Sequence, residues 1–399
     1  MVKKTVIIAI LIATLIIASA YIIYSQYGDS PLFSSFSSSS NSSTQTQSSS
    51  DDTSNESSNK STSSSSSEQS SNSTTITIID GAGHKVNLPD TPIQRIVVLD
   101  GNLAEMLCYM GLQNSIVGRT DAGCPPQLLN VKSVGEAGYA LNVEVILELN
   151  PDIVIADQVL PSDYYGTGAY TKLKDAGIPI YISEPPASAQ NPLQMTPTEL
   201  YNAPTGIDVV CSVMQGLSTV VGNKDRVDAY VTWAQGYNKI VKDRIATLPR
   251  EQQTIAFFEW NFDPYFTTVD MYLYQAGGIN IAENSSIAYL YLSPEVVVEQ
   301  NPSVIIELIS SPTHDINDFI AARNDALTRF QGIDAVTNGC VYVSDFAALN
   351  GLRSIIGYLY WAKWVQPDLF SDIDPAAVAV TLNQQFLGTP TTDVYCYPR

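Results

Sequence analysis

The feature that most constrains the fold of this chain is an internal repeat. Residues 141–156 read LNVEVILELNPDIVIA, and residues 292–307 read LSPEVVVEQNPSVIIE. Glu144 and Glu295 lie 151 residues apart, and the other matched positions keep the same spacing. In each copy a short amphipathic helix ends near an Asn-Pro pair, and an apolar strand follows. The repeat therefore predicts two lobes that are built on the same plan.

Both lobes alternate apolar strands with helices. Continuous apolar runs of this kind are typical of parallel strands that are covered on both faces. The predicted strands are RIVVLD (95–100), SIVG (115–118), DIVIA (152–156), GIPIYI (177–182), TIAFFE (254–259), SVIIEL (303–308) and CVYVSD (340–345). A β-hairpin with its turn at Asp80-Gly81 precedes them. We predict an α/β protein of two Rossmann-like lobes with central, mainly parallel sheets.

One long helix is expected to connect the two lobes. Residues 223–248 carry apolar side chains at helical spacing, with Gly222 before them and Pro249 after them. About 24 helical residues span roughly 36 Å, which is longer than one small domain needs. We expect this helix to join an N-terminal lobe (75–222) to a C-terminal lobe (249–399).

The start of the chain has the pattern of a membrane anchor. Residues 6–24 are apolar and uncharged, and two lysines precede them, so residues 1–24 are expected to span the membrane with the N-terminus inside. A cleaved signal peptide is the alternative, because the Ala-Ser-Ala at 18–20 has the small side chains of a cleavage site. Either way, we expect the folded lobes at the cell surface, outside the cytoplasm.

Residues 25–74 are expected to form a disordered stalk. Ser and Thr dominate this stretch, which cannot bury enough apolar surface to offset the entropy of the chain. Several Asn-x-Ser/Thr triplets within it are consistent with glycosylation.

Charge and residue counts exclude several classes of function. The formal net charge of −20 argues against nucleic acids and anionic membrane surfaces as partners. The chain has only two histidines, which excludes a bare Zn²⁺ or Mn²⁺ site built from several of them, and we expect no cofactor. The five cysteines form no CxxC motif, and both free thiols and one or two disulfides remain open.

The sequence carries no motif of a known catalytic site. GxSxG, HExxH and GxxxxGK[ST] are all missing, so we expect a protein that is not an enzyme. A cell-surface glycoside hydrolase is an alternative, because two cleft carboxylates would suffice for that chemistry. A structural surface protein is the third possibility.

Several short motifs follow one another in a fixed order. They are VGRT and CPPQ within 117–127, DPYFTT at 263–268, GGIN at 277–280, and SDF followed after six residues by Arg at 344–353. Together with the hairpin and the repeated Glu-x₆-Pro helices, they resemble the substrate-binding proteins of ABC importers for ferric siderophores and cobalamin. The resemblance covers about residues 76 to 388. It implies a type III periplasmic-binding-protein fold with a ligand cleft between the lobes.

The repeated glutamates are expected to dock the protein onto its importer. The resemblance implies that Glu144 and Glu295 insert into arginine pockets of the membrane permease, one from each lobe. The repeat points the same way, because two carboxylate stripes at corresponding places suit a partner with two-fold symmetry. An ordinary solvated helix face is the alternative. We expect a monomer that works with separate ABC permease and ATPase subunits, since the chain has no Walker motif.

Ligand contacts are expected at the carboxyl ends of the strands, where open α/β sheets bind ligands. Aromatic rings would supply flat contact area, and arginines would meet the oxygens of an anionic chelate. For each tyrosine, a core ring is the alternative. By resemblance, Trp260, Phe346 and Arg353 fall where the family commonly contacts its ligand. The full set is Asn102, Arg119, Tyr139, Tyr164 and Tyr165 from the first lobe, and Trp260, Tyr265, Tyr289, Asp345, Phe346 and Arg353 from the second.

The expected ligand is an iron(III)-siderophore-type chelate. Cobalamin, another corrinoid or haem bound in the same way is the alternative. Cobalamin binders tend to place an aromatic residue where this chain has Ala122-Gly123, and this difference favours the siderophore.

Overall fold

The computed structural model describes residues 76–137, 140–163, 166–184, 199, 203–261, 264–268, 271–285, 289–311, 314–388 and 393–398. The predicted anchor and stalk lie outside these residues. Within the described ranges, no helix combines the length and the apolar character that crossing a bilayer requires.

Five parallel strands form the sheet of the first lobe, in the order β5-β4-β3-β6-β7. They are β3 (Ile96–Val98), β4 (Ile116–Arg119), β5 (Lys132–Ser133), β6 (Ile153–Ala156) and β7 (Ile180–Ile182). All residues of β3 and β6 are fully buried, as their unbroken apolar sequence predicts. The helices of this lobe are α2 (Gly101–Tyr109), α3 (Val143–Glu148), α4 (Val159–Ser162) and α5 (Ala169–Asp175).

The predicted hairpin is confirmed. β1 (Ile76–Ile79) pairs antiparallel with β2 (Lys85–Leu88). The Asp80 carboxylate accepts hydrogen bonds from the amides of His84 (2.7 Å) and Ile182 (3.3 Å). The turn is thereby fastened to the end of β7.

The second lobe contains a five-stranded sheet of order β10-β8-β12-β13-β14. β8 (Thr254–Trp260), β10 (Gly278–Asn280), β12 (Val304–Ile309) and β13 (Val341–Asp345) are parallel, and β14 (Cys396–Tyr397) is antiparallel at the edge. A separate antiparallel pair consists of β9 (Phe266–Thr268) and β11 (Tyr289–Tyr291). The helices of this lobe are α9 (Met271–Gln275), α10 (Pro294–Gln300), α11 (Ile316–Arg329) and α12 (Asp334–Thr337).

The internal repeat is visible in the topology. The order β4-β3-β6-β7 of the first sheet matches β10-β8-β12-β13 of the second, and α3 and α10 immediately precede β6 and β12. Asn142 and Ser293 cap the two helices with their side chains. The chain leaves both helices through an asparagine in the left-handed region, Asn150 (φ 44°) and Asn301 (φ 41°). The predicted α/β fold, with two similar lobes and mainly parallel sheets, is confirmed.

Two glutamates are buried side by side in the second sheet. Glu259 on β8 and Glu307 on β12 are register partners, and Arg329 of α11 forms ion pairs with both carboxylates. The Tyr265 amide donates to Glu259 (2.7 Å), and Asn261 donates to Glu307 (3.2 Å). Burial, and then the hydrogen bond and charge of Glu259, raise the pKa of Glu307 to about 10. One of the two carboxyls therefore keeps its proton at neutral pH, and Arg329 balances the other.

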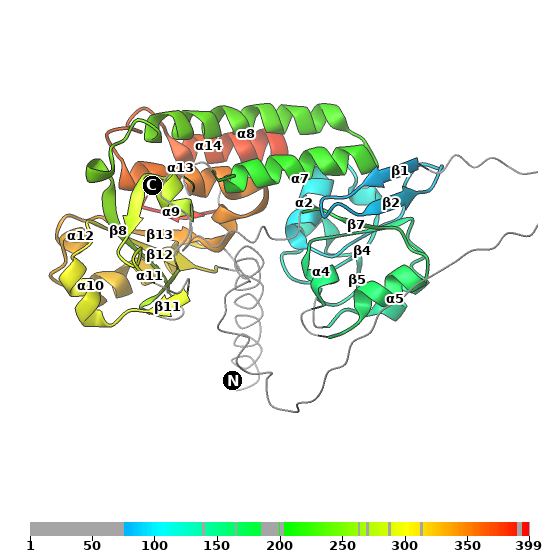
Figure 1. Cartoon of the computed structure of the whole chain (residues 1–399), viewed down its shortest axis with the longest axis horizontal. Coiled ribbons are helices and arrows are strands. Elements are labelled where there is room, and N and C mark those ends of the chain that lie inside the picture. The colour runs from blue at the N-terminus through cyan, green and yellow to red at the C-terminus, as the bar shows by residue number, and fades with distance from the viewer. Residues whose placement is uncertain are drawn as a thin grey trace, which may run out of the picture.

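Two packed helices connect the lobes. The predicted connecting helix is α8 (Lys224–Ile245), which has 22 residues and crosses above both lobes in Figure 1. α7 (Gly206–Val221) precedes α8 in the chain and packs beside it. A tight turn joins the two helices, and in this turn Asn223 has a left-handed backbone (φ 60°). α7 presents Val210, Met214 and Leu217 to the core. The sequence patterns did not single out this second helix.

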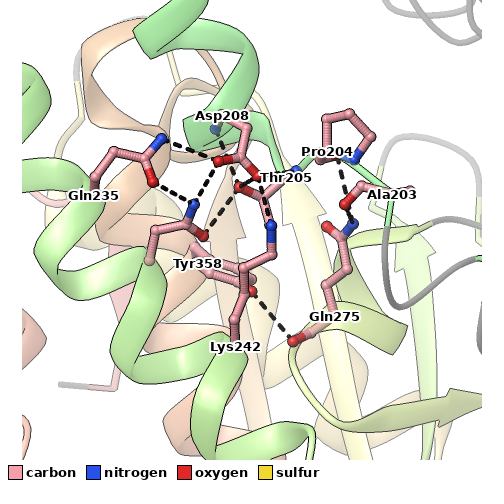
Figure 2. Close-up of polar contacts among 9 residues, drawn as sticks. Ala203, Pro204, Thr205, Asp208, Gln235, Lys242, Gln275 and Tyr358 are labelled. Carbon is pink, nitrogen blue, oxygen red and sulfur yellow. Dashed lines mark hydrogen bonds and ion pairs between the residues drawn. The ribbon is translucent and has the colours of Figure 1, made fainter.

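A polar network fixes the start of α7 against α8 (Figure 2). Thr205 and Asp208 form a capping box, in which the Thr205 hydroxyl accepts from the Asp208 amide at 3.1 Å. The Asp208 carboxylate also accepts from Lys242 (2.8 Å) and Gln235 (3.0 Å) of α8. Burial by itself raises the pKa of Asp208, but the hydrogen bonds from Lys242, Thr205 and Gln235 outweigh it and lower the pKa.

The end of the chain returns to the first lobe. α13 (Ser354–Val365) is almost wholly buried and packs against α7 and α8, and α14 (Pro375–Thr381) continues into a π-helical turn, Leu382–Leu387. In that turn the Phe386 ring lies 5.6 Å from Tyr109 of α2 and 4.8 Å from Trp233 of α8, measured between ring centroids. These contacts hold the C-terminal segment against the first lobe.

Candidate ligand-binding cleft

A cavity lies between the two lobes, at the carboxyl ends of their strands. Asp100 follows β3 and Asp157 follows β6 in the first lobe, whereas Trp260 ends β8 and Phe346 follows β13 in the second. The space holds about 1240 Å³, part of which is open to solvent. Open α/β sheets bind their ligands in this position.

Aromatic side chains form the wall from the second lobe. The ring centroids of Trp260 and Phe346 are 5.7 Å apart, with 37° between the ring planes, and the ring centroid of Phe258, which also lines the cavity, lies 6.3 Å from that of Trp260. Tyr272 completes this wall and donates its hydroxyl hydrogen to the carbonyl of Leu349 at 2.9 Å. The wall offers a flat apolar surface to a large ligand.

Three carboxylates form the opposite wall, from the first lobe. Asp157 directly follows β6, whereas Asp100 and Glu184 each lie two residues after the end of their strands, β3 and β7. The Asp100 carboxylate also caps α2 by accepting from the Leu103 amide at 2.8 Å. Within the described ranges, no three His, Cys, Asp or Glu side chains are arranged to hold a metal ion.

Burial and mutual repulsion make these carboxylates weaker acids. Burial raises the pKa of Asp157, and the charges of Asp100 and Glu184 raise it further. Burial, and then the charge of Asp100, raise the pKa of Glu184 to about 7. Burial also raises the pKa of Asp100, against hydrogen bonds from three backbone amides. A positive charge or several hydrogen-bond donors on a ligand would relieve this repulsion.

Among the described residues that line the cavity, no basic side chain neutralises the three carboxylates. The described residues that line the cavity include no Lys, Arg or His. The internal stretches outside the described ranges also lack all three residue types in the sequence. The carboxyl groups of this wall are therefore either negatively charged or protonated, and no basic side chain of the described lining neutralises them.

The start of α7 forms another edge of the cavity. Pro204, Gly206 and Gln275 all line it. Gln275, the last residue of α9, donates from Nε2 to the carbonyl of Ala203 at 3.2 Å, and its backbone carbonyl accepts from the Tyr358 hydroxyl at 3.3 Å (Figure 2). These bonds fix Gln275 at this edge.

The lobes approach each other closely at one point in the cavity wall. Gly351 has a left-handed backbone (φ 56°), and a Cβ atom there would lie 2.6 Å from Oδ1 of Asn102. Only glycine fits without moving the Asn102 side chain or straining the backbone.

Three of the eleven predicted ligand contacts line the cavity, namely Asn102, Trp260 and Phe346. Tyr139, Tyr164 and Tyr165 lie outside the described residues. Tyr289 belongs to β11, where its backbone pairs with Thr268.

The two predicted arginines do not belong to the described lining. Arg119 forms an ion pair with Asp121. Arg353 forms an ion pair with Glu105 of α2 and donates from Nε to the Tyr395 hydroxyl at 2.9 Å. The Arg353–Glu105 pair therefore links the two lobes.

Asp345 and Tyr265 also have structural partners. The Asp345 carboxylate accepts from the amides of Ala347 (2.7 Å) and Ser311 (2.9 Å). Tyr265 packs its ring against Phe330, with centroids 5.6 Å apart. Neither residue is part of the described lining.

The sequence analysis did not single out the three cleft carboxylates. A signal was present, because an acidic residue follows the apolar runs IVVL, IVIA and IYIS at positions 100, 157 and 184. Parallel strands bring such positions to one edge of the sheet.

The repeated glutamates lie on exposed helix faces. Glu144 is in the first turn of α3, and Glu295 is in the first turn of α10. Hydrogen bonds from its own amide and from the Ser293 hydroxyl lower the pKa of Glu295, so its carboxylate is ionised at neutral pH.

The known proteins that this chain resembles are named as binding proteins for small ligands or as periplasmic binding proteins. The chain is 26% identical over 248 residues to a cobalamin-binding protein of Halobacterium salinarum, covering 60% of each chain. It is 24% identical to the molybdate-binding protein MolA of Haemophilus influenzae, covering 78% of this chain and 91% of MolA. The TroA-like periplasmic binding protein FepB of Veillonella parvula has a similar fold, with a TM-score of 0.63 and 19% identity over 80% of this chain and 99% of FepB.

The profile of the periplasmic binding protein family matches residues 96–348, which is more than half of the chain. The matched region contains both sheets apart from the edge strand β14, and it includes the aromatic wall and the three cleft carboxylates. The chain belongs to the periplasmic binding protein family.

Proposed function

We propose that this protein captures a small molecule in the cleft between its lobes and delivers it to the permease of an ABC importer. The cavity carries the proposal, because it lies at the carboxyl ends of both sheets and has an aromatic wall. Family membership supports the same role. The protein acts as a monomer, held at the outer face of the membrane by residues 1–24 through the stalk.

The electrostatics of the cleft favour a ligand without net negative charge. At an effective dielectric constant of 20, two unit charges about 4 Å apart interact with roughly 4 kcal/mol. Where these carboxylates are ionised, no basic side chain of the described lining offsets their repulsion of an anionic chelate. Arg119 and Arg353, which were expected to meet such an anion, have other partners. The same reasoning disfavours molybdate, although one relative is named for it.

Cobalamin fits these conditions best. Its corrin ring is large and flat, it carries amide groups that donate hydrogen bonds to carboxylates, and its cyano form is uncharged. The relative from Halobacterium salinarum is named for cobalamin binding. A ferric trihydroxamate with one positive charge, such as ferrioxamine B, is the second candidate, because it satisfies the same electrostatic condition and keeps the expected class of iron chelate.

The small residues at Ala122-Gly123 do not count against cobalamin. Gly123 has a left-handed backbone (φ 63°), and a Cβ atom there would lie 3.4 Å from the Cα atom of Gly101, so this loop covers the start of α2 closely. The fold therefore provides its own reason for a small loop at this place.

Titration of the purified full-length chain with five compounds tests the ligand class. Cyanocobalamin and ferrioxamine B are the favoured probes, and ferric enterobactin, haemin and molybdate are the anionic ones. Quenching of the fluorescence of Trp260 in the cleft reports binding. Micromolar or tighter binding of a favoured probe, without its turnover, supports the proposal. Tight binding of the anionic compounds alone would refute the ligand class.

The permease is proposed to bind Glu144 and Glu295 through basic pockets. The equivalent positions of α3 and α10 in the two lobes support this role. The double variant Glu144→Arg, Glu295→Arg is expected to abolish uptake of the ligand by cells and to leave its affinity for the purified protein unchanged. Normal uptake by cells with this variant would rule out the role.

A further inference from the structure

Each lobe exposes an apolar side chain next to its docking glutamate. On α3, Leu147 is 42% exposed, and on α10, Val298 is 61% exposed. Each lies three residues after the glutamate, which is one helical turn, so the two side chains share a face. Leu147 and Val298 are 151 residues apart, the spacing of the internal repeat.

These two side chains do not support the core of either lobe. α3 buries Val143 and Ile146, and α10 buries Val297, whereas Leu147 and Val298 are exposed and belong to none of the buried apolar clusters of the described residues. A scattered exposed apolar residue needs no explanation. Two of them at matched positions of a repeat do, because the repeated fold does not require the same exposed residue type twice.

Carboxylates frame each of these apolar spots. Glu144 precedes Leu147 by one turn, Glu148 follows it directly, and Glu295 and Glu299 hold the same positions around Val298. All four glutamates are exposed. A matching partner therefore offers basic groups around an apolar pocket, and it offers them twice.

α10, and α5 against which α3 packs, lie on the side of the molecule away from α8 (Figure 1). Figure 1 shows α10 at the far end of its lobe from α8, and it shows α5 on the same side of the other lobe. α3 packs against α5. A single partner that faces this side can reach both spots.

We propose that Leu147 and Val298 are apolar anchors of the permease interface, each inserted into an apolar pocket beside the basic groups that bind the glutamates. The inference rests on the proposed function. The partner is a membrane permease with two-fold symmetry, since each half meets one copy of the same acidic and apolar surface. A second copy of this chain would place carboxylates against carboxylates, and an anionic lipid surface would repel them.

Photo-crosslinking in cells that produce the full-length chain tests this inference. A benzophenone amino acid is placed at position 147 or 298, and at position 320 of α11 as the matched control. Ile320 is also exposed (37%) but has no counterpart in the repeat. We expect adducts from 147 and 298 with the same integral membrane subunit, and none with it from 320. Adducts with lipid or with a second copy alone, or no adducts from 147 and 298, would overturn the inference.

Two further probes separate this inference from the proposed function. Crosslinkers at positions 144 and 295 report docking through the glutamates. If they reach the permease and those at 147 and 298 do not, the apolar anchors are wrong and the proposed function stands. If none of the four positions reaches it, both proposals fail.

Affinity for the reconstituted permease complex then gives the contribution of the two anchors. We expect the double variant Leu147→Ser, Val298→Ser to weaken docking roughly tenfold or more, as loss of buried apolar contacts does. Ile320→Ser should leave docking unchanged, and both variants should retain the ligand affinity of the purified protein. Equal docking by both variants would contradict the inference.

Discussion

Replacing Glu184 by Gln is expected to remove part of the pH dependence of stability. Burial raises the pKa of Glu184 from the usual 4.5 to about 7, so the folded protein holds this proton more tightly than the unfolded chain does. Stability is therefore lost as the pH rises from about 4.5 to about 7. The loss is about 1.4 kcal/mol at pH 5.5 and about 3.4 kcal/mol at pH 8.5. Partial exposure of the side chain makes these values upper limits.

Urea unfolding of the ligand-free, full-length protein at pH 5.5 and 8.5 measures this difference. Between the two pH values, the wild-type protein should lose up to about 2 kcal/mol more than Glu184→Gln. Removing this charge also lowers the pKa of Asp157, which adds to the gain at high pH. The exposed Glu148→Gln serves as the control and should behave as the wild type does. Parallel pH profiles for the wild type and Glu184→Gln would refute the reasoning.

Three other changes have expected outcomes. Trp260→Ala should weaken ligand binding by roughly 1–3 kcal/mol in a calorimetric titration, because the ring is a central part of the cleft wall. The control variant Trp233→Ala should keep the wild-type affinity. Equal affinities of the two variants would remove Trp260 from the site. Arg329→Met should lower the free energy of unfolding by roughly 3–5 kcal/mol, since two buried carboxyls lose their cation, and a loss below about 1 kcal/mol would contradict this account. Thr205→Ala should cost about 1 kcal/mol in urea unfolding through loss of the α7 cap, and Thr205→Ser should restore most of it; a Ser variant as unstable as the Ala variant would argue against the cap.

The sheets were predictable because their signal is local. A buried parallel strand needs only a short apolar run, and β3, β6 and β12 are such runs. The repeat at 141–156 and 292–307 then determined that the two lobes share a plan. α7 was harder to predict, because its valines, threonine and glycine are poor helix formers and its stability comes from packing against α8 and α13.

The site was less predictable because its partners are far apart in the sequence. Arg353 was expected to contact the ligand, but its guanidinium pairs with Glu105, 248 positions away. Trp260 and Phe346 were predicted because they stand at strand ends and because the family resemblance places ligand contacts there. Asp100, Asp157 and Glu184 stand at strand ends too, but only the assembled sheet shows that they share one wall.

The position of Phe386 constrains the order in which the molecule can assemble. Its ring completes an aromatic group with Tyr109 near the start of the folded region and with Tyr230 and Trp233 in the connecting helix. While the nascent chain is still being made, these partners have no cover on that side. The first lobe therefore reaches its final packing only after residue 386 has been synthesised, and a chain that stops before this residue leaves the aromatic side chains uncovered.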